Sequence, residues 1–225
     1  MASFNTHLSV ATVAVGVITV PLLSWGMINI YEAILLLFFG VIGGMLPDID
    51  SDNSIPVKIT MKIFSLIIPL LVIFNFTSQL ELLKIFALWI LFSIVLYMIF
   101  TYGFLKLTVH RGIFHTIGMG VVCGELVALF LINSLGLEEN LAMLAGLYVL
   151  FGYLTHLLLD EVYSVDLYNS KLKRSFGSAF KIYDKKNIVG SIFVNALAIA
   201  LFYMLPNLLK LLNEIENIVQ NVKLY

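Results

Sequence analysis

Residues 142–160 read AMLAGLYVLFGYLTHLLLD, an almost unbroken apolar run that ends in a histidine and an aspartate four positions apart. A helix of this length rises about 28 Å, close to the thickness of the hydrocarbon core of a bilayer. The run therefore predicts a membrane-spanning helix. His156 and Asp160 would lie one turn apart on one face of it, where they can chelate a single ion.

The composition of the whole chain supports a location in lipid. Of the 225 residues, 60% are hydrophobic and 12% are charged, which is too little polar surface to cover a soluble protein of this size. The single cysteine excludes a disulfide framework and a cysteine-based zinc site. With a net charge of -1, the chain has no basic excess that would indicate nucleic acid as a partner.

We expect one integral membrane domain over residues 1–225, an all-α polytopic bundle of five to seven transmembrane helices. Seven apolar stretches match the bilayer thickness: 8–28, 32–47, 63–76, 83–103, 115–133, 142–160 and 188–210. The second contains Gly40, Gly43 and Gly44 before Pro47, so we expect it to end early or to be a broken segment.

The basic residues predict the orientation in the membrane. If the seven stretches alternate, ten of the 13 basic residues fall on one side, which the positive-inside rule makes cytoplasmic. This side includes a basic loop at 161–187. The opposite side holds only Lys84, Lys210 and Lys223, and its C-terminal stretch 211–225 has the spacing of an amphipathic helix. The predicted localisation is a multi-pass protein of the inner (plasma) membrane.

Four polar clusters, far apart in sequence, are predicted to meet at the cytoplasmic face. They include all four histidines of the chain. Imidazole and carboxylate together suit zinc, with manganese or iron as alternatives, and the set is large enough for one or two ions. The predicted metal ligands are His7, Asp48, Asp50, His110, His115, His156 and Asp160.

Two further residues of these clusters are candidates for catalysis. Arg111 carries a fork of donors suited to an anionic substrate, although it also fits a positive-inside anchor. Asp52 is a candidate general base, or else an ordinary loop residue. Because Asp48, Asp50 and Asp52 alternate, they would point the same way in extended backbone. We expect Gly112 to turn the chain so that His110 and His115 face one pocket.

Glu125 and the basic segment 171–186 are less specific. Glu125 would lie deep in the fifth stretch, where a carboxylate is either a partnered core residue or part of a site. The segment KLKRSFGSAFKIYDKK mixes cations with aromatic residues and is typical of a loop on an anionic lipid surface. It could also cover the site and recruit a phosphorylated headgroup.

The set LPDID, HRGIFHT and GYLTHLLLDE, with an early histidine, resembles the YdjM family of inner-membrane-associated, LexA-binding, metal-dependent hydrolases. The resemblance runs from His7 to Asp160. Two departures are visible: Phe114 stands where the family usually has threonine, and Glu161 and Val162 follow Asp160 where it often has a Thr-Pro pair. The HxxxD spacing of His156 and Asp160 also looks like part of the zinc site of bacterial phospholipase C enzymes.

These resemblances imply a membrane-embedded hydrolase that acts on a lipid phosphoester at the cytoplasmic interface. The membrane lipid would be the substrate, and the metal would activate water and polarise the phosphoryl group. Two other classes fit the same residues. One is a metal transporter or sensor, for which Glu125 would be the intramembrane carboxylate. The other is a membrane scaffold whose metal is structural.

Overall fold

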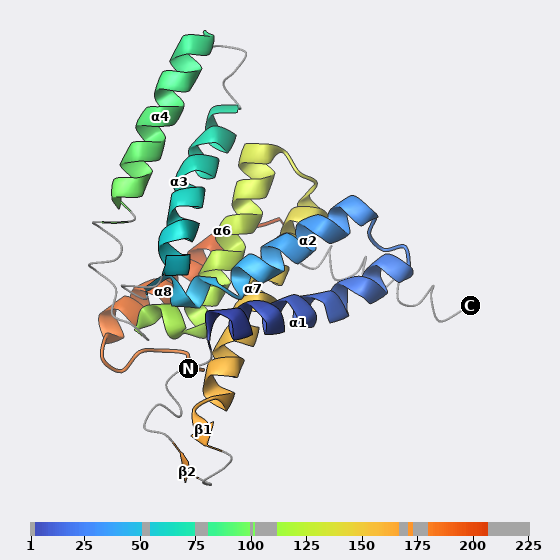
Figure 1. The fold of residues 1–225 in the computed structure, drawn as a ribbon, viewed down its shortest axis with the longest axis vertical. Coiled ribbons are helices and arrows are strands. Elements are labelled where there is room, and N and C mark those ends of the chain that lie inside the picture. Colours follow the sequence, from blue (N-terminus) through green and yellow to red (C-terminus); the bar gives the residue numbers. More distant parts are fainter. Residues whose placement is uncertain are drawn as a thin grey trace.

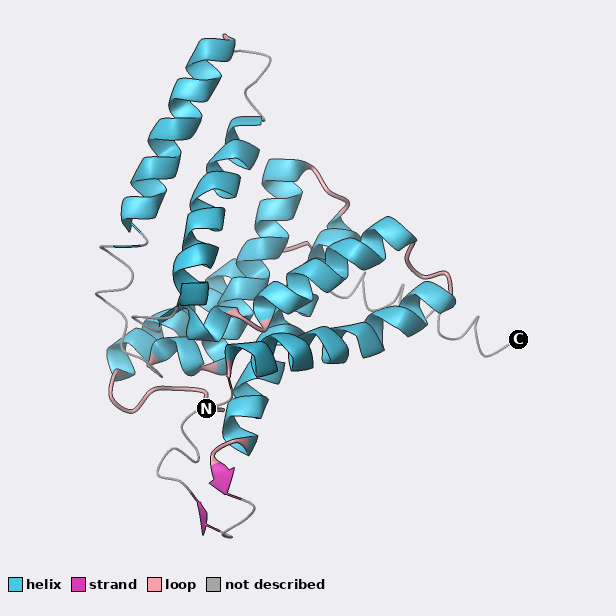
Figure 2. Ribbon diagram, in the orientation of Figure 1, coloured by secondary structure: helices cyan, strands magenta, loops and turns pink. Residues whose placement is uncertain are grey.

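The chain is described by a computed structural model over residues 3–50, 55–74, 81–99, 101, 112–166, 171–172 and 180–206. In the described part, loops connect elements that are all helical except for one two-stranded antiparallel ladder (Figure 2). Its α-helices are α1 (Phe4–Ser24), α2 (Ile30–Gly43), α3 (Ile55–Phe74), α4 (Leu82–Met98), α6 (Ile117–Leu135), α7 (Glu139–Val162) and α8 (Ile188–Phe202). Two 3₁₀ helices are η1 (Leu46–Asp50) and η4 (Ile113–His115), and the strands are β1 (Val165–Asp166) and β2 (Lys171–Leu172).

Each α-helix overlaps one of the seven apolar stretches, so the all-α prediction is confirmed. Four helical segments are long and apolar enough to cross a membrane: Phe4–Ser24, Ile30–Asp48, Ile117–Leu135 and Glu139–Val162. The apolar parts of the other three helices are shorter. Seven crossings therefore stay a prediction. The amphipathic stretch 211–225 lies outside the described residues.

Helix α7 lies at the centre of the bundle. It contacts α1, α2 and α6, and α6 in turn packs against α8 (Figure 1). Its buried residues include Ala142, Ala145, Gly146 and Gly152, whose small size lets neighbouring helices approach closely. The main hydrophobic core lies where α1, α2, α6 and α7 meet. Any polar residue on the buried face of α7 is therefore enclosed by several helices.

Helices α1 and α2 form an antiparallel hairpin. The turn between them contains Gly26 at a φ of 68°, a conformation that favours glycine. Asn29 and Glu32 then form a capping box that starts α2. The hairpin brings the beginning of α1 beside the end of α2, and so brings His7 near the segment that contains Asp48.

Glycines of α2 lie directly against the backbone of α7. A Cβ atom on Gly152 of α7 would overlap the carbonyl oxygen of Gly40, and one on Gly43 would overlap the carbonyl oxygen of Val149. Side chains at these positions would force the helices apart. The glycines that suggested a broken segment thus form the surface of α2 that packs against α7. Helix α2 ends at Gly43, four residues before the end of the predicted stretch 32–47.

Helices α3 and α4 form a second hairpin that extends away from the other helices (Figure 1). Trp89 of α4 donates a hydrogen bond from Nε1 to the carbonyl oxygen of Leu66 at 2.9 Å. Most of the large apolar side chains of α4 are exposed, and many on α1, α2 and α8 are exposed too. An apolar exterior of this extent is expected for a protein surrounded by lipid.

Candidate metal centre

His7 is the fourth residue of α1, not a residue before the first span as predicted. The helix starts early because Ser3 caps it, with its side chain accepting a hydrogen bond from the Thr6 backbone. The buried residues of α1 recur every four positions, at His7, Ala11, Val15 and Thr19. His7 therefore extends an apolar stripe that packs into the bundle.

Asp48 lies in the 3₁₀ helix η1, so the prediction of extended backbone for the LPDID segment was wrong. Proline favours the first turn of a helix because its φ is already suitable, and Pro47 is the second residue of η1. Residues two apart in a 3₁₀ helix lie on different faces, so alternation does not align Asp48 with Asp50. The side chain of Asp50, and the whole of Asp52, lie outside the described residues.

His115 is the last residue of η4 and is completely buried. Thr116 caps α6: its hydroxyl accepts from the Met119 backbone and donates to the carbonyl oxygen of Ile113. The hydroxyl of Tyr153 on α7 donates to the carbonyl oxygen of Phe114. Together these bonds hold the turn that carries His115 against α7. His110 and Arg111 lie outside the described residues.

His156 and Asp160 share the buried face of α7, as their spacing predicts. The Nδ1 of His156 lies 2.8 Å from the carbonyl oxygen of Gly44. A carbonyl can only accept, so Nδ1 carries the proton, and in the neutral ring Nε2 has a free lone pair. This arrangement, in which one nitrogen bonds a carbonyl and the other faces the site, is typical of metal-ligating histidines.

The five described side chains converge within a few ångströms. Nε2 of His7 lies 3.3 Å from Oδ1 of Asp160, and Nε2 of His156 lies 3.6 Å from Oδ1 of Asp48. Nε2 of His115 lies 3.7 Å from Oδ2 of Asp160 and 3.9 Å from Oδ1 of Asp48. The rings of His7 and His156 stack at 3.7 Å.

These distances suit ligands of a shared ion better than hydrogen bonds. A hydrogen bond to nitrogen is about 2.7–3.2 Å long, whereas ligands about 2.0–2.1 Å from a tetrahedral ion lie about 3.3 Å apart. Among the described residues, Nε2 of His156, Oδ1 of Asp48 and both ring nitrogens of His7 have no hydrogen-bond partner. Buried polar atoms rarely remain so, which indicates that the site fits a metal ion.

Two sets of three side chains have ligand atoms within 4.8 Å of one another. One set is His7, His156 and Asp160, and the other is Asp48, His115 and His156. Both include His156, whose Nδ1 is already bonded to Gly44. The remaining nitrogen can bind only one ion, so the two sets cannot both be filled completely.

Two contributors to the site were missed by the sequence analysis. The carbonyl of Gly44 leaves no trace in the sequence, because any residue has one. Tyr153 did leave a signal, since Tyr153, His156 and Asp160 follow a spacing of three and four that places them on one helix face. The Tyr153 bond goes to backbone, so it does not depend on the side chain at position 114.

Tyr153→Phe is expected to weaken metal retention by about tenfold, in the range seen when groups supporting metal ligands are removed. The change removes the hydrogen bond that holds η4, and with it the position of His115, but keeps the ring. Titration of the metal-loaded protein with a chelator measures the effect. Tyr148→Phe is a matched control, because Tyr148 lies elsewhere on α7 and its hydroxyl accepts a hydrogen bond from Thr19 of α1. Equal losses in the two variants would contradict the assignment.

The model of the YdjM inner membrane protein family matches residues 1–209 of this chain. The match covers every α-helix described above and all five converging side chains. No curated protein and no solved structure matches the chain, so the likeness to phospholipase C finds no support there. With its apolar helices and this match over nearly its whole length, the chain belongs to the YdjM family of inner membrane proteins.

Proposed function

We propose that this protein is a membrane-embedded, metal-dependent hydrolase that acts on the phosphoester of a membrane lipid. The observation that carries the proposal is the convergence of five side chains from four separate segments, namely His7, Asp48, His115, His156 and Asp160. Zinc is the expected ion, with manganese or iron as alternatives, because the donors combine imidazole with carboxylate.

We expect one ion for each chain. His156 would donate Nε2, held in place by the bond from its Nδ1 to Gly44. His7 and Asp160 complete one set of three with His156, and Asp48 and His115 complete the other. A second ion would have to find ligands other than His156. His110 and Asp50 remain predicted metal ligands.

The centre is more accessible on the side of Asp48. The side chain of Asp48 is 20% exposed, whereas those of His7, His115 and Asp160 are at most 2% exposed. A substrate can therefore approach past η1 while α1, α6 and α7 exclude water from the other sides. A divalent ion held there would activate water near neutral pH and polarise a phosphoryl oxygen. Asp48 is placed to orient the incoming water.

The surroundings favour a lipid as the substrate. Much of the exterior is apolar, so a lipid can reach the protein without leaving the bilayer. The end of the basic segment 171–186 also lies next to the site: Lys181 pairs with Thr116 in a parallel bridge, and its carbonyl accepts from Ile117. The ammonium group of Lys181 pairs with Asp184 at 3.1 Å, so the exposed Lys185 and Lys186 of the same segment carry the charge that would attract a phosphorylated headgroup. The predicted roles of Arg111 and Asp52 belong to the same proposal.

A structural metal is the competing reading, since four of the five side chains are almost fully buried. A closed set of four protein ligands would leave no position for water. Transport is less favoured, because the ligands lie at helix ends and secondary transporters usually bind near the bilayer midplane. Enzymatic turnover decides between these functions.

The purified protein is expected to release phosphate or a phosphorylated headgroup from lipids presented in detergent micelles. Turnover should stop with a chelator and return when zinc or manganese is restored. Asp48→Asn should lower turnover by about 100-fold or more while changing metal content less, because a neutral amide orients the attacking water less well than a carboxylate does. Metal that stays bound without turnover on phospholipids and lipid phosphates would instead favour the structural role.

A further inference from the structure

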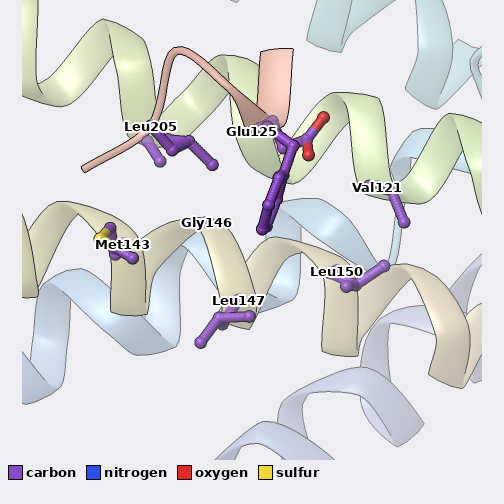
Figure 3. Close-up of a pocket in the computed structure, with 10 residues that line it drawn as sticks. Val121, Glu125, Met143, Gly146, Leu147, Leu150 and Leu205 are labelled. Carbon is purple, nitrogen blue, oxygen red and sulfur yellow. The ribbon is translucent and has the colours of Figure 1, made fainter. Parts of the chain in front are cut away.

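A second candidate site lies away from the metal centre, between α6, α7 and the end of α8. It is a cavity of about 180 Å³ whose walls are almost entirely apolar. Val121, Glu125 and Ala128 of α6 line one side, and Met143, Leu147 and Leu150 of α7 line the other. Figure 3 shows Glu125 on α6 opposite Gly146 and Leu147 of α7, with Leu205 beside them.

Among the described residues that line the cavity, Glu125 is the one that can ionise. Glu125 is only 7% exposed, and its Oε2 atom has no hydrogen-bond partner among the described residues. Burying such an oxygen without a partner is unfavourable, because the oxygen loses its hydrogen bonds to water. It sits near the middle of a helix long enough to span the membrane, where ionisable residues usually mark a site.

The cavity opens toward the apolar exterior of the bundle. Leu147 and Phe202, both part of its lining, are 41% and 51% exposed. Gly124 and Gly146 lie against each other and keep α6 and α7 close, so the space arises beside this contact. A cavity of about 150 Å³ is enough to hold a benzene ring, so this one can take a ring or a short chain segment. An occupant would enter from the bilayer.

We propose that this cavity binds an amphiphile from the membrane through a hydroxyl or amine that donates a hydrogen bond to Glu125. The apolar walls receive the chain or ring of the ligand, and its donor bonds the carboxyl group of Glu125 where that group reaches the lining. Glu125 lies about 12 Å along α6 from the first residue of that helix, so this site is separate from the metal centre. The proposal does not depend on hydrolase activity.

Photolabelling of the full chain in lipid nanodiscs tests the proposal. The probes are octanol, octylamine and octane, each carrying a diazirine in its chain, and labelling of residues 121–128 and 143–150 is normalised to that of α4. We expect the alcohol or the amine to label these segments about fivefold more than octane, as one net hydrogen bond allows. Glu125→Leu should reduce that preference to the level of octane.

Two further variants make the result specific. Leu147→Trp should block the mouth of the cavity and reduce labelling, whereas Leu126→Trp should not, because Leu126 is similarly exposed but does not line the cavity. Glu125→Gln keeps an acceptor but removes the charge. It should therefore spare labelling by octanol and weaken labelling by octylamine, which is a cation at neutral pH. Equal labelling by all three probes in the wild type, or equal effects of the two tryptophans, would overturn the proposal.

Discussion

Replacing His156 with alanine is expected to remove the metal ion from the purified protein, from about one equivalent per chain to less than about a tenth. His156 is the residue shared by both possible ligand sets, and the bond of its Nδ1 to Gly44 leaves Nε2 as its free donor. Without it, each set is left with two side chains. Elemental analysis of the detergent-purified protein measures the loss.

The control for this experiment is Thr19→Val. Thr19 is buried on the same stripe of α1 as His7 and bonds Tyr148, yet it lies about three turns away from the metal centre. Its replacement should leave the metal content unchanged. Unaltered metal in the double variant His156→Ala, Asp160→Ala, or no metal in the wild type, would refute the centre.

Gly152→Ala is expected to destabilise the bundle by at least about 3 kcal/mol, at the upper end of the effects of overpacking. The added methyl group would meet the carbonyl oxygen of Gly40 and the backbone nitrogen of Gly44 on α2. Backbone atoms of a helix cannot rotate away as a side chain can. Thermal unfolding in detergent, followed by circular dichroism, measures the change.

The same substitution should also impair metal binding, because it separates His156 from the carbonyl of Gly44 that orients it. Gly16→Ala provides the matched control. It lies inside α1 with no atom near the added methyl group, so it should be neutral or stabilise by about 0.5–1 kcal/mol. Similar unfolding temperatures for the two variants would contradict the close packing of α2 on α7.

The helices were largely predictable. Apolar runs of bilayer length mark an α-helix without reference to any partner, and all seven stretches coincide with a helix. The ends were less predictable, because they depend on local capping. Ser3 starts α1 before His7, and the glycines that close α2 do so for contact with α7.

The residues of the candidate site could be predicted from the sequence, but the backbone conformation that places them could not. The spacing of His156 and Asp160 predicts a shared helix face, and they do share it. The alternating aspartates after Pro47 would point the same way only in extended backbone, whereas the segment Leu46–Asp50 forms the 3₁₀ helix η1. For Asp50, Asp52, His110 and Arg111 the predicted roles stay predictions.

The sequence by itself determined that this chain is a bundle of apolar helices with histidines and aspartates at helix ends, since hydropathy and helical periodicity are local properties. Only the tertiary structure decided that His7, Asp48 and His115 meet His156 and Asp160. That meeting depends on the hairpin of α1 and α2, on glycine contacts and on a carbonyl of Gly44. Contacts between segments more than 100 residues apart arise from packing, which no local pattern encodes.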